Sequence, residues 1–259
     1  MAHVITICNH KGGVGKTTTV VNLAHAFVKT GKKVLVVDAD PQANASQTLG
    51  KVPPHDQPVG VSDLFMEKGK VFSTTCVDTK IPEIKLIPAT LRMFQLERMI
   101  PETKKVLGLR AKLDAGAREM FDYILIDTPP NLGTFQLNAL AASDYFMVPV
   151  QADSFHALTG LEYLMETAGF VREDCNEDLK FLRVLVTMYD GRTSVAKTMA
   201  QEIRRHFGKD RVFQTVINRN TLLAQAVIEG KTIFSKDTRA PGAKDHMALA
   251  RELAQILGG

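Results

Sequence analysis

Short, continuous apolar runs alternate along this chain with longer helical stretches. Runs of about four to eight apolar residues bounded by turn-forming residues predict strands that are buried on both faces of a parallel sheet. Their alternation with helices predicts an α/β fold, in which a doubly wound, mostly parallel β-sheet is flanked by helices. The predicted strands are residues 4–8, 34–37, 121–126, 144–150 and 181–187, and the predicted helices are residues 17–30, 158–170 and 248–257.

No repeat, low-complexity tract or linker composition divides the sequence, so we expect a single domain over residues 1–259. Three prolines place residues 51–60 in a surface loop. Ser62 is expected to cap a short helix over residues 63–68. The polar stretch at residues 91–117 is predicted to be a helix whose charged residues form a solvated face.

A glycine-rich segment, residues 9–18, joins the first predicted strand to the first predicted helix. Its glycines let the backbone turn its N–H groups towards an anion, because no Cβ restricts φ and ψ. Lys16 can reach the β- and γ-phosphates of a nucleotide, and the Thr17 hydroxyl suits Mg²⁺. A glycine turn without a ligand is the alternative, which the order of strand, loop and helix disfavours. The predicted nucleotide contacts in this loop are Lys11, Gly12, Gly13, Val14, Gly15, Lys16, Thr17 and Thr18.

The first position of this loop departs from the usual G-x-x-x-x-G-K-[ST] pattern, because His10 replaces the glycine and Lys11 follows it. Since Lys16 already serves the phosphates in its own chain, a second long cation can reach a nucleotide bound in another copy. The K-G-G-x-G-K-[ST] loop resembles that of the ParA/MinD family of ATPases, and most closely the short-chain ParA branch, often called Soj. The resemblance implies a P-loop NTPase fold with a deviant Walker A motif, ATP or ADP as ligand, and a homodimer in which Lys11 contacts the nucleotide of the other copy.

Two aspartates, Asp38 and Asp40, follow the predicted strand at residues 34–37. Ligands of open α/β sheets bind at the carboxyl ends of strands, and alternate residues of an extended chain share a side, so we expect both to face the phosphate site. One would hold a metal-bound water and the other would orient the attacking water. A carboxylate that only caps the turn before Pro41 is the alternative. The family resemblance implies that Asp40 positions or activates water, and that residues 38–44 form the first switch.

A third acid, Asp127, follows the hydrophobic run at residues 121–126. An acid after four hydrophobic residues is the Walker B pattern, which supports Mg²⁺ and gains weight when it follows a phosphate loop. By resemblance, residues 127–130 are the second switch and residues 84–89 are the third strand of the family. The predicted magnesium site involves Thr17, Asp40 and Asp127, and the predicted catalytic residues are Lys11, Lys16 and Asp40.

Composition excludes several classes of protein. The 259 residues are 45% hydrophobic and 23% charged, which is ordinary for a globular domain. Cys8, Cys76 and Cys175 form no C-x-x-C pair, so zinc and iron–sulfur sites are disfavoured and reduced thiols are expected. The sequence has no signal-peptide pattern, and no apolar run approaches the ~20 residues needed to cross a bilayer. We therefore expect a cytoplasmic protein.

Positive charge is concentrated between residues 192 and 244, where eleven lysines and arginines accompany four acids. This segment carries a charge of +7, more than the +4 of the whole chain, and such clustering is typical of contact with nucleic-acid phosphates. A solvated basic face without a partner is the alternative. Because aromatic residues are not interleaved for stacking on bases, and Trp is absent, we predict sequence-nonspecific binding to double-stranded DNA.

The resemblance identifies individual residues in this basic segment. ParA proteins carry a D-x-R-T segment whose arginine helps to bind nonspecific DNA, and residues 190–193 match it. Their I-P-R-N-V-R segment corresponds to residues 217–222, where Leu222 replaces a second DNA-contacting arginine, so that contact is lost or moved to a neighbour. Asn218 replaces the proline that lies against adenine, and can hydrogen-bond the base instead. The predicted DNA contacts are Arg192, Arg204, Arg205, Arg219 and Arg239, and the further predicted nucleotide contacts are Met188, Asn218 and Arg219.

These features together predict an ATPase that positions a plasmid, a chromosome or a protein cargo. ATP would bridge two copies, the dimer would bind the nucleoid, and a ParB-like activator or cargo adaptor would accelerate hydrolysis and release. Only three residues precede the first predicted strand, so we expect no helix-turn-helix extension and no operator-specific repression.

A MinD-like ATPase that is positioned on a membrane is the alternative function. That family ends in a basic amphipathic helix, whereas Arg251 is the one basic residue of the predicted helix at residues 248–257. A helix that packs on the core is therefore expected, and no membrane contact. An iron–sulfur reductase like the nitrogenase iron protein would need paired cluster cysteines. A bacterial tyrosine kinase would need a tyrosine-rich tail, and the last of the four tyrosines here is Tyr189.

Overall fold

One mixed sheet runs through the centre of the molecule in the computed structural model, which describes residues 1–65, 72–99, 108–152 and 156–258. In this part of the chain, seven strands form the sheet in the order β3-β4-β2-β5-β1-β6-β7. The strands are β1 (His3–Ile7), β2 (Val34–Asp38), β3 (Val77–Asp78), β4 (Ile84–Ile87), β5 (Tyr123–Asp127), β6 (Tyr145–Gln151) and β7 (Lys180–Thr187). All neighbouring strands pair in parallel except β3, a two-residue edge strand that runs antiparallel to β4. The predicted fold class is confirmed.

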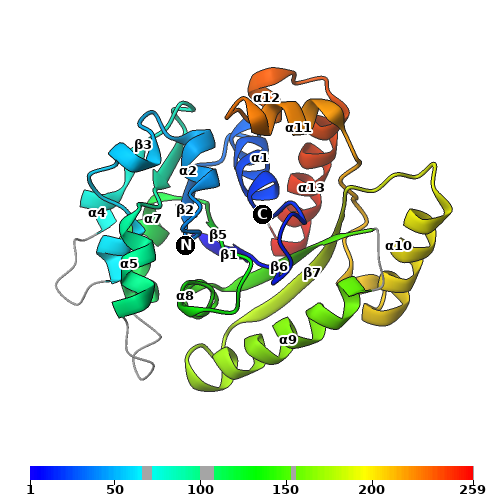
Figure 1. Cartoon of the computed structure of the whole chain (residues 1–259), viewed down its shortest axis with the longest axis horizontal. Coiled ribbons are helices and arrows are strands. Elements are labelled where there is room, and N and C mark those ends of the chain that lie inside the picture. The colour runs from blue at the N-terminus through cyan, green and yellow to red at the C-terminus, as the bar shows by residue number, and fades with distance from the viewer. Residues whose placement is uncertain (66–71, 100–107, 153–155, 259) are drawn as a thin grey trace.

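Helices cover both faces of the sheet (Figure 1). The helix α1 packs with α11, α12 and α13 on one side, whereas α8 and α9 lie on the other. The helices are α1 (Lys16–Lys29), α2 (Asn44–Leu49), α3 (Val61–Phe65), α4 (Phe72–Thr75), α5 (Arg92–Met99), α6 (Leu109–Asp114), α7 (Ala117–Met120), α8 (Thr134–Ala142), α9 (His156–Asp174), α10 (Ser194–Phe207), α11 (Thr221–Ile228), α12 (Ile233–Lys236) and α13 (Pro241–Leu257), with 3-10 turns at Pro54–Asp56 and Lys209–Arg211.

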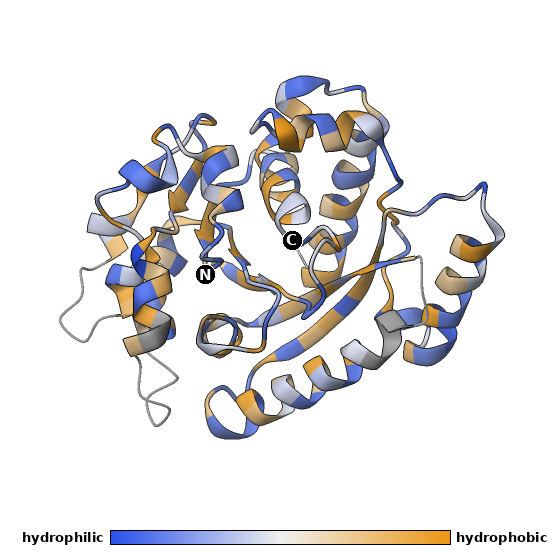
Figure 2. Ribbon diagram, in the orientation of Figure 1, coloured by the Kyte–Doolittle hydropathy of each residue, from blue (hydrophilic) through white to orange (hydrophobic). Residues whose placement is uncertain are grey.

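The central strands are mostly apolar at consecutive positions because their two faces pack against different helices. In β2, Val34 and Val36 pack with α1, whereas Leu35 and Val37 pack on the opposite face. The strands in the centre are accordingly coloured mostly as hydrophobic, while the outer helices carry hydrophilic segments (Figure 2). Burial of both faces explains why the sequence shows continuous apolar runs here instead of alternation.

The sheet register brings the acidic strand ends together. Asp127, at the end of β5, pairs with Ile7 of β1 on one side and with Asp38 of β2 on the other. Residues that follow these three strands therefore meet at one edge of the sheet, beside the start of α1. This is the edge at which open α/β sheets bind their ligands.

Buried polar contacts attach α12 to the middle of α1. The Asn22 side chain accepts a hydrogen bond from the Ile233 N–H at 2.7 Å and donates one to the Thr18 carbonyl oxygen at 2.7 Å. The His25 Nδ1 atom lies 2.7 Å from the Thr232 hydroxyl, and both side chains are buried. Paired polar groups of this kind fix the position of an element more specifically than apolar contact does, because each lost bond leaves a buried group unpaired.

Several sequence-based boundaries need correction. The polar stretch at residues 91–117 is not one helix, because α5, α6 and α7 divide its described part and α7 extends beyond it, whereas residues 100–107 lie outside the description. Ser62 does not cap the short helix, because it lies inside α3 with its hydroxyl paired to Thr90. Instead, Asp63 accepts a hydrogen bond from the Gly60 N–H, and the predicted continuation over residues 66–68 lies outside the described residues.

The last helix is longer than predicted and packs on the core. It begins at Pro241, a favourable first residue because proline presets φ and lacks the N–H that would be unpaired there. Leu249 and Leu253 are completely buried. Glu252 pairs with Arg183 of β7 at 3.0 Å, which anchors the helix to the sheet. The apolar face of α13 is thus used inside the molecule. No helix in the described part of the chain has the length and apolarity to cross a membrane.

Acid should destabilise the fold partly through His25. Burial lowers the pKa of His25 to about 4, from about 6.5 in an unfolded chain. The unfolded state therefore takes up this proton first, and stability falls as the pH drops from about 6.5 to about 4. We expect His25→Gln, which can still pair with Thr232, to remove up to about 3 kcal/mol of this loss. Urea unfolding of both proteins at pH 7 and pH 4 measures it. Equal losses in the two proteins would contradict the assignment.

Candidate functional site

The loop that follows β1 has the conformation of an anion cradle. Gly13 and Gly15 adopt positive φ values of 75° and 88°, in the left-handed region where a side chain is strained. The helix α1 begins directly after them at Lys16, and none of the described side chains caps its first turn. The first N–H groups of the helix have no partner within it, so they remain available to a bound anion.

Lys16 extends across this cradle. Its side chain is buried, and its Nζ atom donates a hydrogen bond to the Lys11 carbonyl oxygen at 3.2 Å. Burial lowers the pKa of Lys16, and the carboxylates of Asp127 and Asp40 oppose this shift. The ammonium group is thus held at the mouth of the loop, where it can contact the phosphates that the loop surrounds.

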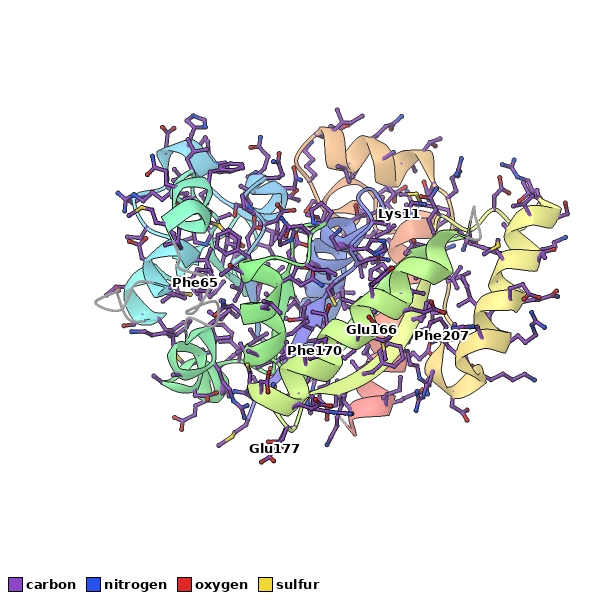
Figure 3. All side chains as sticks on the ribbon, turned by 60° about the horizontal axis from the view of Figure 1, so that its bottom comes forward. Lys11, Phe65, Glu166, Phe170, Glu177 and Phe207 are labelled. Atoms are coloured by element: carbon purple, nitrogen blue, oxygen red, sulfur yellow. The ribbon has the colours of Figure 1, made fainter. Side chains whose placement is uncertain are left out.

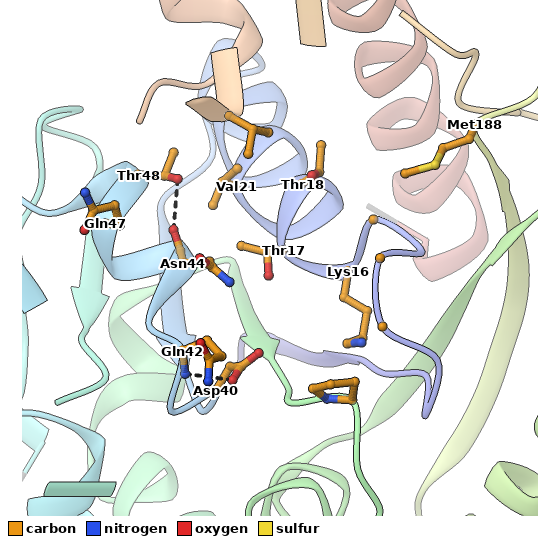
Figure 4. A pocket seen from close by; sticks show the side chains of 15 residues that line it. Lys16, Thr17, Thr18, Val21, Asp40, Gln42, Asn44, Gln47, Thr48 and Met188 are labelled. Atoms are coloured by element: carbon orange, nitrogen blue, oxygen red, sulfur yellow. Dashed lines mark hydrogen bonds between the residues drawn. The ribbon is translucent and has the colours of Figure 1, made fainter. Parts of the chain in front are cut away.

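A cavity of about 360 Å³ opens in front of the loop (Figure 4). Lys16, Asp40 and Met188 line it from three different parts of the chain, and Figure 4 shows Thr17 between the loop and α2. The cavity is large enough for the phosphates and sugar of a nucleotide. Its remaining lining residues are Gly12, Gly13, Gly15, Thr18, Val21, Gln42, Asn44, Gln47, Thr48, Pro130 and Val227.

The two aspartates after β2 have different surroundings. Asp40 lines the cavity, accepts a hydrogen bond from the Gln42 N–H at 2.9 Å, and has its pKa raised by burial. Asp38 is completely buried and is absent from the cavity wall, so the prediction that both face the phosphates is wrong for Asp38. Its carboxylate instead accepts bonds from the N–H and hydroxyl of Ser46, at 2.7 and 2.6 Å. Asp38 therefore holds the start of α2 in place.

Asp127 fits the requirements of a cation site. It is completely buried, and neither of its carboxylate oxygens has a hydrogen-bond partner among the described residues. Burial raises its pKa well above the ordinary value, nearby Asp38 adds to the shift, and the hydroxyl of Thr17 opposes it. An orphaned carboxylate behind Thr17 and Asp40 lacks positive charge that a divalent cation would supply. Since the described ranges hold no group of three or more acidic, His or Cys side chains able to bind a metal, nucleotide phosphates would have to complete the coordination.

A second cavity of about 380 Å³ adjoins the first, because Gly15, Thr18, Met188 and Val227 line both. Its walls come mainly from residues 217–220, from α11 and from the start of α1, and Thr187 and Met188 at the end of β7 complete them. Met188 has a φ of 49°, which is strained for a side chain and is held by this position at the strand end. The cavity has the size and the apolar walls that suit a purine base. Its other lining residues are Thr19, Thr187, Ile217, Asn218, Arg219, Asn220, Leu223, Ala224 and His246.

Lys11 lies outside both cavities. Its N–H group donates to the Asn9 side chain at 3.0 Å, and Asn9 in turn donates to the Pro149 carbonyl oxygen of β6. The neighbouring His10 ring packs directly on Gly160 of α9, where a Cβ would lie 1.5 Å from the His10 Cε1 atom. Figure 3 accordingly shows Lys11 near the start of α9. The loop thus presents Lys11 at its outer edge.

The predicted DNA-contacting arginines are spread over several elements. Arg192 is largely exposed and forms a 2.7 Å ion pair with Asp190. Arg205 on α10 pairs with Glu202, while Arg204 bonds a carbonyl oxygen of its own helix. Arg239 lies between α12 and α13, which Figure 1 places apart from α10.

The structure also locates Leu222 and Asn218, two of the residues by which this chain departs from the family segment. Leu222, where the family has an arginine, packs against the core beside α1. Arg219 lines the second cavity, where a purine base is expected, and its side chain is also exposed to solvent. Asn218 lines the same cavity and pairs with Asp245 of α13.

Most predicted nucleotide contacts meet in one cleft formed by the two cavities. All of them except Lys11 and Val14 line at least one cavity, and Val14 accepts a hydrogen bond from Thr187 beneath the loop. The sequence analysis did not predict that Gln47 and Thr48 of α2 line the first cavity. It also did not predict that two residues of α13 contribute to the second cavity, His246 by lining it and Asp245 by bonding to Asn218. Asn44 and Gln42 lie in the predicted first switch, and this was the one feature of the sequence that could have indicated a place for them in the cavity wall.

Comparison with known proteins agrees with this geometry. A protein-family model described as an AAA domain matches residues 2–181. The sporulation initiation inhibitor protein Soj of Bacillus subtilis is 39% identical over 98% of this chain and 99% of its own length. The chromosome partitioning protein ParA of Caulobacter vibrioides is 38% identical over 96% of this chain and 93% of its own length.

A solved structure extends the likeness to the whole fold. Cobyrinic acid a,c-diamide synthase from Mycobacterium smegmatis, crystallised with bound ADP and magnesium, has a TM-score of 0.84 and 29% identity, and the match covers 100% of this chain and 96% of that one. The phosphate loop, the acidic strand ends and the near full-length identity to partitioning proteins lead to one assignment. The chain belongs to the ParA/Soj family of partitioning ATPases.

Proposed function

We propose that this protein is an ATP-dependent partition switch: ATP and Mg²⁺ join two copies, the dimer binds nonspecific DNA of the nucleoid, and a ParB-like activator or cargo adaptor stimulates hydrolysis. The observation that carries this proposal is the continuous cleft formed by the phosphate cavity and the apolar second cavity. Its two halves match the two chemical parts of a nucleotide, because one offers N–H groups and an ammonium and the other offers apolar walls.

Mg²⁺ would be held through Thr17, Asp40 and Asp127 together with the phosphates. When bound, such an ion offsets phosphate charge as the bond to the γ-phosphate breaks. Thr17 supplies a hydroxyl from the first turn of α1, and Asp127 lies behind it with both oxygens lacking a hydrogen-bond partner among the described residues. This arrangement supports Asp127 as a group that orients the ion's surroundings from a buried position.

Asp40 is the best placed group to orient the attacking water. Its carboxylate reaches the cavity wall, and the Gln42 N–H holds one of its oxygens (Figure 4). Burial raises its pKa, which brings a carboxylate nearer to the range useful for accepting a proton. The turn after it places Ala43 at a positive φ of 55°, a strained conformation that fits a segment able to rearrange when the γ-phosphate is lost.

Lys11 supports a dimer that shares its nucleotides. Lys16 and the loop amides already serve the phosphates within one copy, and Lys11 lies at the outer edge of the loop. A two-fold arrangement would place each Lys11 against the nucleotide of the other copy. Binding of ATP, with its γ-phosphate, would then favour the dimer over the monomer, which is the differential affinity that a switch requires.

Exposed arginines support contact with DNA. Arg192, Arg205 and Arg239 present their side chains to solvent, and the segment that holds them carries a charge of +7. Because the contacts would be made to phosphates, we expect strong dependence on salt and little on sequence. Leu222 packs against the core, so this position makes no contact with DNA, and Arg219 is its nearest exposed basic neighbour in sequence.

The membrane-associated alternative finds no support in the last helix. Leu249 and Leu253 are buried against the core, so α13 would have to leave the molecule to enter a lipid surface. Its removal would also break the ion pair between Glu252 and Arg183. We therefore infer that the surface this protein binds is the nucleoid and not a membrane.

Replacing Lys16 should abolish nucleotide binding. Lys16→Ala removes the buried ammonium that neutralises the β- and γ-phosphates, which we expect to weaken ATP binding by at least about 30-fold, or ~2 kcal/mol. Lys29→Ala, an exposed lysine on the same helix, is the matched control and should bind as the parent does. Titration with a fluorescent ATP analogue measures both. Parent-like affinity in Lys16→Ala would show that the loop does not bind phosphates.

Replacing Asp40 should separate binding from turnover. Asp40→Ala should bind ATP and Mg²⁺ but hydrolyse it at least about 100-fold more slowly, because a positioned base contributes about that much. The variant should accumulate as a dimer in size-exclusion chromatography with ATP. Asp40→Asn, which keeps an oxygen for the Gln42 N–H, should behave in the same way, whereas the exposed Asp56→Ala should hydrolyse normally. A variant that stays monomeric with ATP bound would count against the shared-nucleotide dimer.

Replacing Lys11 should prevent the dimer without preventing binding. Loss of a buried partner for phosphate across an interface costs roughly 2–5 kcal/mol, which is enough to convert a micromolar dimer into monomers. The decisive protein is the double variant Lys11→Ala with Asp40→Ala, which should be monomeric with ATP bound and should lose DNA binding. Lys33→Ala in the same Asp40→Ala background is the control, since Lys33 is exposed. If the Lys11 double variant still dimerises on ATP and binds DNA, Lys11 acts only within its own loop.

A further inference from the structure

The second cavity contains a polar side chain, Asn218, that is held at one end of its amide group. Most of its wall is apolar, and two of its polar side chains have partners already: the Thr187 hydroxyl donates to the Val14 carbonyl oxygen, and the Asn220 side chain accepts from the Leu222 N–H. Asn218 differs, because only one end of its amide group is occupied.

Asp245 on α13 determines which end of Asn218 is occupied. The Asn218 side-chain nitrogen lies 3.2 and 3.1 Å from the two carboxylate oxygens of Asp245, and the Asn218 backbone N–H donates to the same carboxylate at 2.9 Å. A carboxylate can only accept hydrogen bonds, so the NH₂ group must face it. The carbonyl oxygen Oδ1 of Asn218 is therefore available to accept a hydrogen bond from a ligand, since no donor in the described part of the chain contacts it.

The backbone around Asn218 is also fixed. Tyr189 and Asn218 form a parallel bridge beyond the end of β7, in which the Tyr189 N–H donates to the Ile217 carbonyl oxygen and the Arg219 N–H donates to the Tyr189 carbonyl oxygen. A residue held by backbone bonds on both sides and by Asp245 through its side chain is pre-organised before any ligand arrives. Such a group can discriminate between ligands, since it cannot turn to suit a different one.

We propose that Asn218 selects adenine, with its Oδ1 atom accepting a hydrogen bond from the exocyclic 6-amino group, and that Asp245 is the positioning residue that prevents the amide from flipping. Guanine and hypoxanthine carry a carbonyl oxygen at the 6-position, which would face Oδ1 as a second acceptor and leave both unpaired. This inference rests on the proposed function, because it requires a purine nucleotide in the cleft.

The expected discrimination is about tenfold to a hundredfold in favour of ATP, the range produced when a partly buried acceptor loses its partner. Competition against a fluorescent ATP analogue measures the affinities of ATP, GTP, ITP and purine riboside triphosphate. Purine riboside triphosphate lacks the 6-amino group but carries no oxygen there, so it should bind more weakly than ATP and more tightly than ITP.

Two variants separate selection from simple support of the wall. Asn218→Leu should bind ATP less tightly and reduce the ratio of ATP to ITP affinity to about one. Asp245→Asn lets the Asn218 amide flip and present its NH₂ group, so it should gain affinity for ITP and GTP while losing little for ATP. A purely structural role of Asp245 would weaken all nucleotides together. Gln225→Leu removes an exposed amide on α11 outside the cavity and should leave every ratio unchanged.

The outcomes distinguish this inference from the function on which it rests. If the parent protein binds none of the triphosphates, the proposed function fails. If the parent binds ATP and ITP equally, or if Asn218→Leu keeps the parent's preference, nucleotide binding stands and the role of Asn218 is overturned. Circular dichroism of each variant excludes unfolding as the cause of a change.

Discussion

The structure depends on a concentration of buried ionisable groups at one edge of the sheet. Asp38, Asp40 and Asp127 lie at or just after the ends of β2 and β5, and Lys16 enters the same space from α1. Each carboxylate is costly to bury, and burial raises the pKa of all three. Ser46 and backbone N–H groups bond to Asp38, whereas neither oxygen of Asp127 has a hydrogen-bond partner among the described residues, and only the nearby Thr17 hydroxyl and Lys16 favour its charged form. A site with this imbalance gains stability from a cation and a nucleotide, which couples ligand binding to the arrangement of the surrounding strands.

The walls of the nucleotide cleft come from both ends of the chain. The phosphate loop follows β1, while the apolar cavity is lined largely by residues 217–220 and α11, with single residues from β7 and α13. Asn22 and His25 tie α1 to α12 through buried hydrogen bonds, and Glu252 ties α13 to β7. The elements that carry the loop and the base-sized cavity are therefore connected through buried polar contacts.

Parts of the cleft that must respond to the nucleotide are held differently. Residues 40–44 form a strained turn with Ala43 at positive φ, and α2 behind it is anchored through Ser46. The outer edge of the phosphate loop contacts α9 through His10 and Gly160. The buried core thus supports the cleft, whereas the segments at its rim are held by contacts from only a few residues. The proposed switch requires rearrangement at this rim, where the contacts are fewer than in the buried core.

The glycine loop, the acidic strand ends and the buried strands can all be predicted from the sequence, because each depends on residues adjacent in the chain. Which groups come to lie together depends on how distant segments pack. Asp38 and Asp40 are two positions apart in the sequence, yet Asp38 bonds to Ser46 whereas Asp40 lines the cavity. The polar stretch at residues 91–117 showed helical propensity, whereas its described part is divided into α5, α6 and α7, with Gly108 and Gly116 at positive φ directly before α6 and α7. Asn218 and Asp245 are 27 residues apart, and no local pattern predicts their pairing, because α13 brings them together only when it packs on the sheet.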